Sequence, residues 1–431
     1  MTAPQYEVII VGGRPAGSSL ALRLGRAGLR VLLIEKARLA EQSPLSVPFL
    51  MNSAMQLLDE LDLAEADYAG DAPRLRRFYL HFRDSFRTHL HIADVAGRDY
   101  VYVVDRVRFD CALWHKLASQ PTVDCRQQSQ LVDLLRDTSG QVCGITYRDA
   151  DGQLRTAHAP WVVGADGRYS LVARKAQARI TLSHPEVATS ALYAFWSGVR
   201  PYEPRDGEPH AVQIYSSCDG FSTIAMPTTA GRVGIVLQGC ADRFLPKTGH
   251  IEDYYLAGLR KMPAVWDRLG KAQRVSPMFG CKRIGNLYRQ AGGPGWLLCG
   301  DAYHQKDFID AQGIYDALLE SKLLAGCLID WHSGKLAAAD VVSRYDREAF
   351  AATHPMFQAT VDRLKRELFT TLPPLVIKTV LRTLMTSPAY MQRFAKLVSR
   401  QIEPKDFAPK TFLLTTFLKN LPHVLLGKEG G

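Results

Sequence analysis

A glycine-rich turn near the N-terminus carries the clearest chemical signal in this 431-residue sequence. It lies between an apolar run at residues 8–11 and a helical pattern over residues 16–27. In such a turn the free N–H groups at the helix start can bind a diphosphate, and glycines let the backbone turn tightly and the helix approach the strand. The turn reads Gly12-Gly13-Arg14-Pro15-Ala16-Gly17.

Glu35 and Lys36 follow the second apolar strand of this unit, residues 31–34. A carboxylate at that position accepts hydrogen bonds from a ribose, so the pattern predicts a dinucleotide site. Arg14 stands where the usual motif has its second glycine. Its side chain must turn away from the ligand or reach the phosphates with its guanidinium group. The alternative interpretation is a plain strand-turn-helix unit that binds nothing.

Two further aspartates follow buried apolar runs. Asp166-Gly167 comes after residues 161–165, and Gly300-Asp301 comes after residues 295–299 and continues to Gln312-Gly313. Open α/β sheets bind ligands beyond the carboxyl ends of their parallel strands. We therefore expect both aspartates to lie in one crevice with the glycine turn.

Taken in order, these motifs resemble the flavoprotein aromatic hydroxylases of the p-hydroxybenzoate hydroxylase fold, a superfamily that also contains flavin halogenases and geranylgeranyl reductases. The resemblance covers roughly residues 5–350 and implies FAD as the cofactor, with NAD(P)H as co-substrate. It includes Arg106, which begins a stretch similar to the RxxxD motif of the family. The cofactor-binding residues that we predict are Gly12, Gly13, Arg14, Ala16, Gly17, Glu35, Lys36, Arg106, Asp166, Gly167, Gly300, Asp301, Gln312 and Gly313.

The resemblance implies an FAD-dependent monooxygenase that uses NAD(P)H and O₂ to hydroxylate or epoxidise a mainly apolar or aromatic small molecule through a C4a-hydroperoxyflavin. Residues 222–227 lack both tryptophans of the halogenase motif WxWxIP, which disfavours halogenation. One alternative is an FAD-dependent reductase or dehydrogenase of a prenyl or lipid-like chain. Another is a non-catalytic flavin-binding module, favoured by Arg14 and by Phe308, which replaces the proline that the family places beside the flavin ring.

Candidates for catalysis and substrate binding rest on position alone. His304 and Asp307 follow the Gly300-Asp301 motif, as does Lys306, and each has a side chain that can act as acid or base. They are equally well explained as solvated loop residues. The predicted substrate pocket consists of Tyr193, Phe195, Tyr215, Met226 and Phe308, although such residues on alternating strands usually pack in a core. The eight cysteines are scattered without a CxxC pair, and we predict no metal site.

The elements that must position these residues indicate an α/β fold. A strand-helix-strand unit spans residues 6–35, helices are predicted at 50–68, 106–120 and 314–332, and a hairpin at 78–92. Alternating segments at 191–199, 211–216, 221–226 and 233–238 predict an antiparallel sheet. We assign residues 1–77, 98–172 and 271–340 to a discontinuous Rossmann-like FAD-binding domain. Residues 78–97 and 173–270 form the substrate-binding sheet domain, and 341–431 a helical C-terminal region.

Composition and charge indicate where the protein is located and which classes of binding partner it has. A 47% hydrophobic and 22% charged sequence is typical of a folded globular protein. The N-terminus has no signal-peptide pattern and no apolar run spans a membrane, so we predict a cytoplasmic protein. Residues 360–431 carry twelve Lys or Arg against five Asp or Glu, most of the net charge of +10. This location disfavours nucleic acid as a partner. The basic C-terminal helices are expected to dock on the core or on a second subunit, with contact to an anionic membrane surface as the alternative; the oligomeric state is not predicted.

Overall fold

A six-stranded, mainly parallel sheet forms the centre of the first part of the molecule. The computed structural model describes residues 5–40, 48–82, 85–202, 211–217, 219–247 and 249–425. The sheet has the order β20-β21-β11-β1-β2-β7, and only β20 runs antiparallel to its neighbour. Strands β1, β2 and β11 are buried at every position, as expected for a parallel sheet covered on both faces. The strands are β1 (Val8–Val11), β2 (Val31–Ile34), β7 (Val123–Arg126), β11 (Trp161–Gly164), β20 (Gly292–Gly293) and β21 (Trp296–Leu298).

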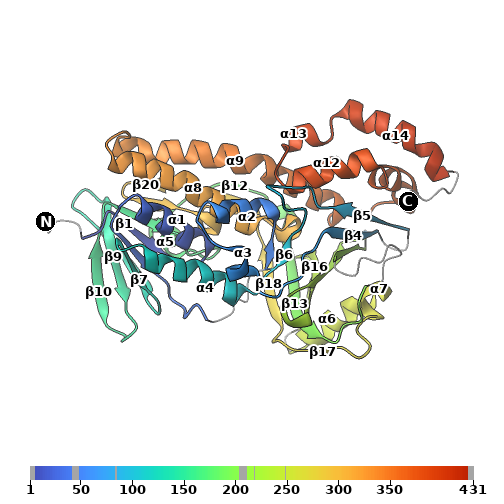
Figure 1. The fold of residues 1–431 in the computed structure, drawn as a ribbon, viewed down its shortest axis with the longest axis horizontal. Helices are drawn as coiled ribbons and strands as arrows, with labels where there is room; N and C mark the ends of the chain where they lie inside the picture. Colours follow the sequence, from blue (N-terminus) through green and yellow to red (C-terminus); the bar gives the residue numbers. More distant parts are fainter. Residues whose placement is uncertain are drawn as a thin grey trace.

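Helices and a small sheet surround this parallel sheet. Helices α1 and α8 pack against each other, α4 contacts α1, and a three-stranded antiparallel sheet contacts β11 through β9. In Figure 1 the long helix α9 runs along the top of the molecule above these layers. The elements are α1 (Pro15–Arg26), α4 (Arg106–Lys116), α5 (Leu171–Lys175), α8 (Gly313–His332), α9 (Ala338–Glu367), β8 (Gln130–Arg136), β9 (Val142–Arg148) and β10 (Leu154–His158).

A second, mainly antiparallel sheet has the order β17-β13-β16-β15-β14-β4-β5, and β18 also pairs with β13. Both of its faces are apolar: one meets the C-terminal helices, and the other meets α6 (Ile251–Arg260) and α7 (Pro263–Trp266). Residues 83 and 84, in the predicted hairpin, lie outside the described residues. The strands are β4 (Arg77–Phe82), β5 (Phe86–His91), β13 (Thr189–Ser197), β14 (Val212–Ser216), β15 (Phe221–Pro227), β16 (Val233–Cys240), β17 (Gln273–Arg274) and β18 (Phe279–Ile284).

These layers confirm the predicted α/β fold with a Rossmann-like sheet, an antiparallel sheet and C-terminal helices. The domain boundaries stay a prediction, with one correction. Strands β17 and β18 lie in the range 271–340 that we assigned to the FAD-binding domain, yet both pair with β13 of the antiparallel sheet. The strand β18 was not predicted because it is short and only partly buried, so polar and basic residues interrupt its apolar pattern.

The helix predicted over residues 50–68 is interrupted. It consists of α2 and α3, and Asp62 between them has a φ of 50°, in the left-handed region that a helix cannot continue through. Short strands complete the frame: β3 pairs with β6, and β19 joins β12 to β22. These elements are β3 (Phe49–Leu50), α2 (Asn52–Asp59), α3 (Glu65–Ala69), β6 (Tyr102–Val103), β12 (Ile180–Ser183), β19 (Leu287–Arg289) and β22 (His304–Gln305).

The C-terminal helices dock on the antiparallel sheet rather than extending away from it. Ile377, Met385, Met391 and Val398 are buried in the same apolar cluster as Phe78 of β4. Helix α12 contacts β5, and Figure 1 shows these helices beside the β4–β5 edge. They are α10 (Pro374–Val376), a π-helical stretch (Ile377–Leu381), α11 (Arg382–Met385), α12 (Pro388–Val398), α13 (Pro404–Phe407) and α14 (Lys410–Leu425).

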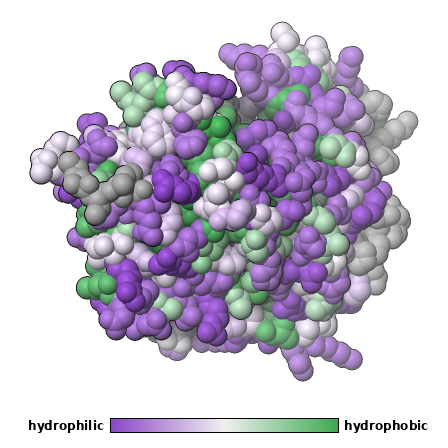
Figure 2. All heavy atoms as spheres, turned by 60° about the vertical axis from the view of Figure 1, so that its left-hand side comes forward, coloured by the Kyte–Doolittle hydropathy of each residue, from purple (hydrophilic) through white to green (hydrophobic). Residues whose placement is uncertain are grey.

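The surface is largely polar on the face shown in Figure 2, where hydrophobic residues gather only in small groups. No helix among the described residues is long and apolar enough to cross a membrane. The buried apolar residues form three clusters, one around the parallel sheet and one on each face of the antiparallel sheet.

Candidate cofactor site

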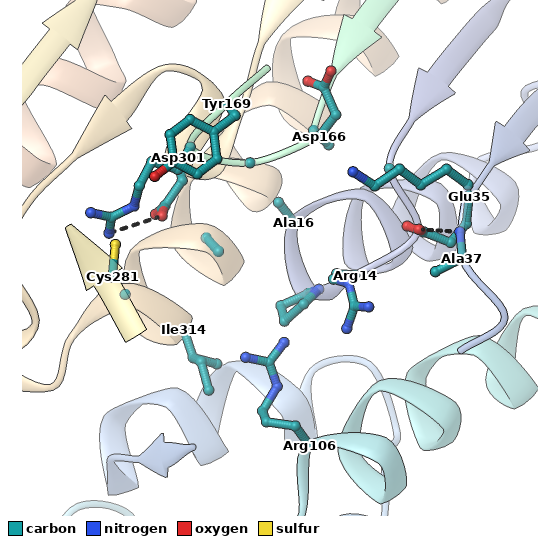
Figure 3. A pocket seen from close by; sticks show the side chains of 18 of the residues that line it. Arg14, Ala16, Glu35, Ala37, Arg106, Asp166, Tyr169, Cys281, Asp301 and Ile314 are labelled. Carbon is teal, nitrogen blue, oxygen red and sulfur yellow. Dashed lines mark hydrogen bonds and ion pairs between the residues drawn. The ribbon is translucent and has the colours of Figure 1, made fainter. Parts of the chain in front are cut away.

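A cavity of about 620 Å³ opens where β1, β2 and β11 end and where α1 and α8 begin. Figure 3 shows Glu35 and Ala37 on one side of it, Arg14 near the middle with Arg106 below, and Ile314 and Cys281 on the opposite side. Ten of the fourteen predicted cofactor residues line this cavity: Gly12, Arg14, Ala16, Glu35, Lys36, Arg106, Asp166, Gly167, Asp301 and Gly313.

The glycine turn is fixed by close backbone packing. Gly12 has a φ of +107°, and a Cβ there would lie 2.4 Å from the carbonyl oxygen of Ala165. A Cβ on Gly17 would lie 1.8 Å from the carbonyl oxygen of Gly12. Gly13 donates its N–H to Glu35 Oε2 over 2.8 Å. Gly13 and Gly17 are thus not among the residues that line the cavity; they shape the turn that does.

Two arginines share one buried carboxylate beside the turn. Arg14 Nη1 lies 2.5 Å from Asp110 Oδ2, and Arg106 Nη2 lies 2.9 Å from Asp110 Oδ1. Asp110 is fully buried. Since both arginines pair with this single carboxylate, one negative charge faces two positive charges. Helix α1 starts at the same place without a side-chain cap. The excess positive charge and the uncapped helix start fit a bound diphosphate.

The two motif aspartates differ in orientation. Asp166 accepts hydrogen bonds from Ser170 Oγ at 2.5 Å and from the N–H of Leu171 at 2.6 Å, at the start of α5. Asp301 keeps 39% of its side chain exposed and lies 3.6 Å from Arg168 Nη2. Asp301 is therefore the aspartate whose carboxylate faces the cavity with spare acceptors. Gly300 stands behind it, because a Cβ there would lie 2.9 Å from the Cβ of Ala16.

The chemistry of the lining changes along the cavity in the way FAD requires. The two Glu35 oxygens accept from the N–H groups of Gly13 and Ala37, and their remaining lone pairs would accept from ribose hydroxyls. The arginines and the α1 start would supply positive charge for the phosphates. Tyr193, Phe308 and Ile314 supply aromatic and aliphatic walls for a flat ring system. The residues present fit FAD, and its ring would lie against the apolar walls near the start of α8.

Gln312 requires a correction. We predicted a cofactor contact, but its side chain donates from Nε2 to the carbonyl oxygen of Val398 at 2.7 Å and accepts from Arg400 Nε at 2.5 Å. The side chain is fully buried against the C-terminal helices instead of facing the cavity. The resemblance located the start of α8 but carried no information on the helices that follow residue 350.

His304 also requires a correction. The predicted acid or base is buried away from the cavity, with Nδ1 3.0 Å from Glu320 Oε1 and its ring stacked on Tyr288 at 4.5 Å between centroids. Burial lowers the pKa of His304 to about 3, so the ring is neutral near pH 7. Burial likewise raises the pKa of Glu320 well above its ordinary value. The pair supports the backbone of Gly300, whose N–H donates to Glu320 Oε2 at 2.7 Å.

Asp307 lines the cavity, but its carboxylate is already engaged. It accepts hydrogen bonds from Thr189, from Gln238 Nε2 at 2.8 Å and from the N–H of Ile309 at 2.9 Å. Burial raises the pKa of Asp307 above its ordinary value. These bonds hold the loop that carries Phe308, and the catalytic role of Asp307 stays a prediction.

The predicted substrate residues divide between the two faces of the antiparallel sheet. Tyr193 lines the cofactor cavity, and Phe308 lines both that cavity and a small apolar chamber of about 50 Å³. Met226 lines the chamber as well. Phe195 lies on the same face but packs beside Tyr193, with 6.1 Å between ring centroids, and is not among the lining residues of either space.

Tyr215 points to the opposite face, which corrects our assignment. It pairs in register with Thr223, whose side chain points to the face of the sheet opposite to that of Ile224 and Met226. Its ring stacks on His81 at 4.3 Å and lines a separate cavity of about 680 Å³ under α6 and α7. Both faces of this sheet are apolar, so alternation alone does not show which face meets the cofactor.

Several site residues were missed. Arg168 follows the Asp166-Gly167 motif directly, so its position in the sequence was a usable signal. Asp110 lies one helical turn after Arg106, and this spacing was a signal for an ion pair. Lys306, which lines the cavity, was considered only as an acid or base. Asp316, in the first turn of α8, forms a buried ion pair with Arg400 at 2.6 Å. This pair gave no local signal, because the two residues are 84 positions apart in the sequence.

The fold and the site define an FAD-binding protein with a Rossmann-like sheet. A family model described as an FAD binding domain matches residues 5–362, and the chain belongs to this family. With relatives that are reductases and monooxygenases, it is an FAD-dependent oxidoreductase.

Three relatives show how far the similarity extends. A digeranylgeranylglycerophospholipid reductase of Methanocella arvoryzae is 25% identical over 350 residues, covering 80% of this chain and 82% of that protein. A squalene monooxygenase of Panax ginseng is 32% identical over 196 residues, covering 44% of this chain and 34% of that protein. A solved flavin-dependent brominase superposes with a TM-score of 0.78 at 18% identity, covering 98% of this chain and all of that one, which shows the shared fold alone.

Proposed function

We propose that the protein is an FAD-dependent monooxygenase that uses NAD(P)H and O₂ to hydroxylate or epoxidise a mainly apolar or aromatic small molecule. The observation that carries this proposal is the apolar chamber next to the ring end of the cofactor cavity. The two spaces share Phe49, Phe308 and Ala311 as lining residues. A cavity for benzene needs about 150 Å³. The chamber of about 50 Å³ would therefore take only an apolar end of the substrate, beside the reactive ring.

The walls of the chamber suit an apolar substrate. Its lining includes Met51, Phe78, Leu80, Ile224 and Met226, and Phe394 and Val398 of α12 close it on the side of the C-terminal helices. The polar pair at its border, Asp310 and Arg363, is already joined at 2.6 Å. Bound FAD would supply electron transfer from NAD(P)H and the activation of O₂. The residues of the chain would position the substrate and exclude water. A dry site keeps the activated oxygen from being lost before it reacts with the substrate.

The relative named a squalene monooxygenase supports oxygen transfer, although the match covers less than half of this chain. A second candidate is an FAD-dependent reductase of a prenyl or lipid-like chain. It is favoured by the digeranylgeranylglycerophospholipid reductase, which matches over most of both proteins. Both candidates use an apolar substrate, and they differ in whether O₂ is consumed.

The experiment that separates them compares turnover with and without O₂. The FAD-loaded protein is mixed with NADH or NADPH and with a panel of squalene, geranylgeraniol and indole. A monooxygenase is expected to consume O₂ with NAD(P)H when one of these probes binds. The reduced protein, mixed with O₂, is also expected to show a transient near-ultraviolet absorbance. Saturation of a carbon–carbon double bond under anaerobic conditions, without that transient, would replace this proposal by the reductase.

A further inference from the structure

A buried cluster of three charged side chains lies at the ring end of the cofactor cavity. Lys306 Nζ is 2.6 Å from Asp316 Oδ2, and Arg400 Nη2 is 2.6 Å from Asp316 Oδ1. The three side chains are 4%, 6% and 9% exposed. One carboxylate thus faces two cations, and the cluster keeps one net positive charge in a region of low dielectric.

Lys306 is the member of the cluster that lines the cavity. An ammonium group has three N–H donors. Asp316 takes up one of them as the ion-pair partner at 2.6 Å, and among the described residues Lys306 Nζ has no second acceptor. A buried cation with unused donors that borders a ligand cavity is a costly arrangement unless a ligand accepts from it.

Arg400 lies in the turn that follows α12, beyond residue 362 where the family match ends. Besides Asp316 it binds Gln312 Oε1 at 2.5 Å, and its guanidinium stacks over Tyr315 at 4.8 Å from the ring centroid. These contacts tie the C-terminal helices to the first turn of α8. Gly313 and Ile314, which begin that helix, line the cavity, so Arg400 fixes both the helix start and Asp316.

The neighbouring carboxylates have partners of their own: Asp301 lies 3.6 Å from Arg168 Nη2, and Asp307 accepts hydrogen bonds from Thr189 and Gln238. Burial lowers the pKa of Lys306 below its ordinary value, and the charge of Asp316 offsets this only in part. Burial would raise the pKa of Asp316, but Lys306 and Arg400 keep it below its ordinary value. Asp310 is paired with Arg363, and the shifts of His304 and Glu320 favour their neutral forms. The positive end of the α8 dipole adds to the same field.

We propose that Lys306 binds the edge of the flavin ring and stabilises the negative charge that the ring gains on reduction, and that Arg400 is the positioning residue that holds it there. Taking up two electrons and one proton leaves the reduced flavin with one negative charge. Positive charge at the ring end therefore favours reduced over oxidised FAD. The inference depends on the FAD site alone and holds for either candidate reaction.

The test is the two-electron reduction potential of bound FAD, measured anaerobically without substrate, together with the affinities for oxidised and reduced FAD. In Lys306→Met the preference for reduced FAD is expected to fall about tenfold, which shifts the potential about 30 mV more negative. Lys306→Arg keeps the charge and is expected to restore most of the potential. Arg400→Met is expected to shift the potential in the same direction by a smaller amount.

Matched controls remove a cation elsewhere on the same elements. Lys322→Met on α8 removes a half-exposed lysine paired with Glu60, and Lys396→Met on α12 removes an exposed one. Both are expected to leave the potential unchanged. The proposal is overturned if Lys306→Met binds FAD with an unaltered reduction potential. It is also overturned if the potential of Lys306→Arg is shifted as far as that of Lys306→Met. If Lys306→Met binds no FAD, an unshifted potential in Arg400→Met overturns the positioning role. Failure of the monooxygenase proposal leaves these readouts unaffected, because neither O₂ nor substrate is present.

Discussion

Individual glycines and charges decide whether the cofactor can bind. Gly17 is the sharpest case, because its missing Cβ leaves room for the carbonyl oxygen of Gly12. Asp110 is the counterpart among charged residues, since its carboxylate pairs with both Arg14 and Arg106. Neither role depends on which reaction follows.

Gly17→Ala is expected to abolish tight FAD binding. A Cβ 1.8 Å from a backbone oxygen forces the turn to move, and backbone cannot yield as a flexible side chain does. FAD affinity, measured by flavin fluorescence, should fall by more than about a hundredfold, which corresponds to about 2.7 kcal/mol. Gly326→Ala on α8 is the control, because a Cβ there meets nothing within 4 Å. That variant should bind FAD normally and be as stable as the parent or more so.

Asp110→Asn is expected to weaken both the fold and FAD binding. It leaves Arg106 buried and Arg14 half-buried without their shared carboxylate, which should reduce the free energy of unfolding by about 3 kcal/mol. Asp105→Asn is the control: Asp105 caps α4 through the N–H groups of Val107 and Arg108, and its loss should cost about 1 kcal/mol or less. Equal losses of stability and of FAD affinity in the two variants would contradict the role of Asp110.

His81 gives a prediction for pH. Burial, followed by the charges of Arg87 and Arg268, lowers its pKa from 6.5 to about 3. The unfolded chain therefore takes up the proton first, and stability is lost as pH falls from about 6.5 towards 3 at about 1.4 kcal/mol per pH unit. His81→Phe keeps the stack on Tyr215 and should remove that share of the slope in denaturant titrations between pH 6 and 4.5. An unchanged slope in His81→Phe would contradict this assignment.

Among the elements, α12 connects the C-terminal region to the proposed reaction. Its residues Phe394 and Val398 line the apolar chamber, whereas Leu397 on the same helix is buried but is not among the lining residues. The helix therefore closes the chamber on one side, and its side chains set how much space a substrate has.

Phe394→Ala is expected to enlarge the chamber and to admit longer or bulkier apolar substrates. The variant should lose about 2 kcal/mol of stability and show a lower KM for the larger members of a substrate series. Leu397→Ala should lose a similar amount of stability with the parent substrate preference. The closing role of α12 is wrong if both variants change the preference equally, or if neither does.

The sequence predicted the elements whose information is local. The glycine turn, the strand ends with Asp166 and Asp301, and the start of α8 could be located because each has a short motif with a physical reason. The orientation of Tyr215 could not, because both faces of its sheet are apolar. The burial of His304 depends on Glu320 and Tyr288, and Gln312 depends on Arg400, 88 positions away.

At the scale of the whole molecule, the basic C-terminal region has two sides. The inner side covers the chamber and supplies Arg400, while Leu375, Leu414 and Leu418 on the outer side are exposed. Contact of that outer side with an anionic membrane surface, and the oligomeric state, stay predictions. The cofactor cavity therefore borders the apolar chamber, and α12 of the C-terminal region closes that chamber.

The most direct test of the central proposal is a turnover with ¹⁸O₂ using the FAD-loaded protein, NAD(P)H and the probe that stimulates O₂ consumption. We expect a product that contains one ¹⁸O atom, with one equivalent of NAD(P)H oxidised for each product formed. A product that gains two hydrogens and no ¹⁸O, formed equally well without O₂, would contradict the proposal.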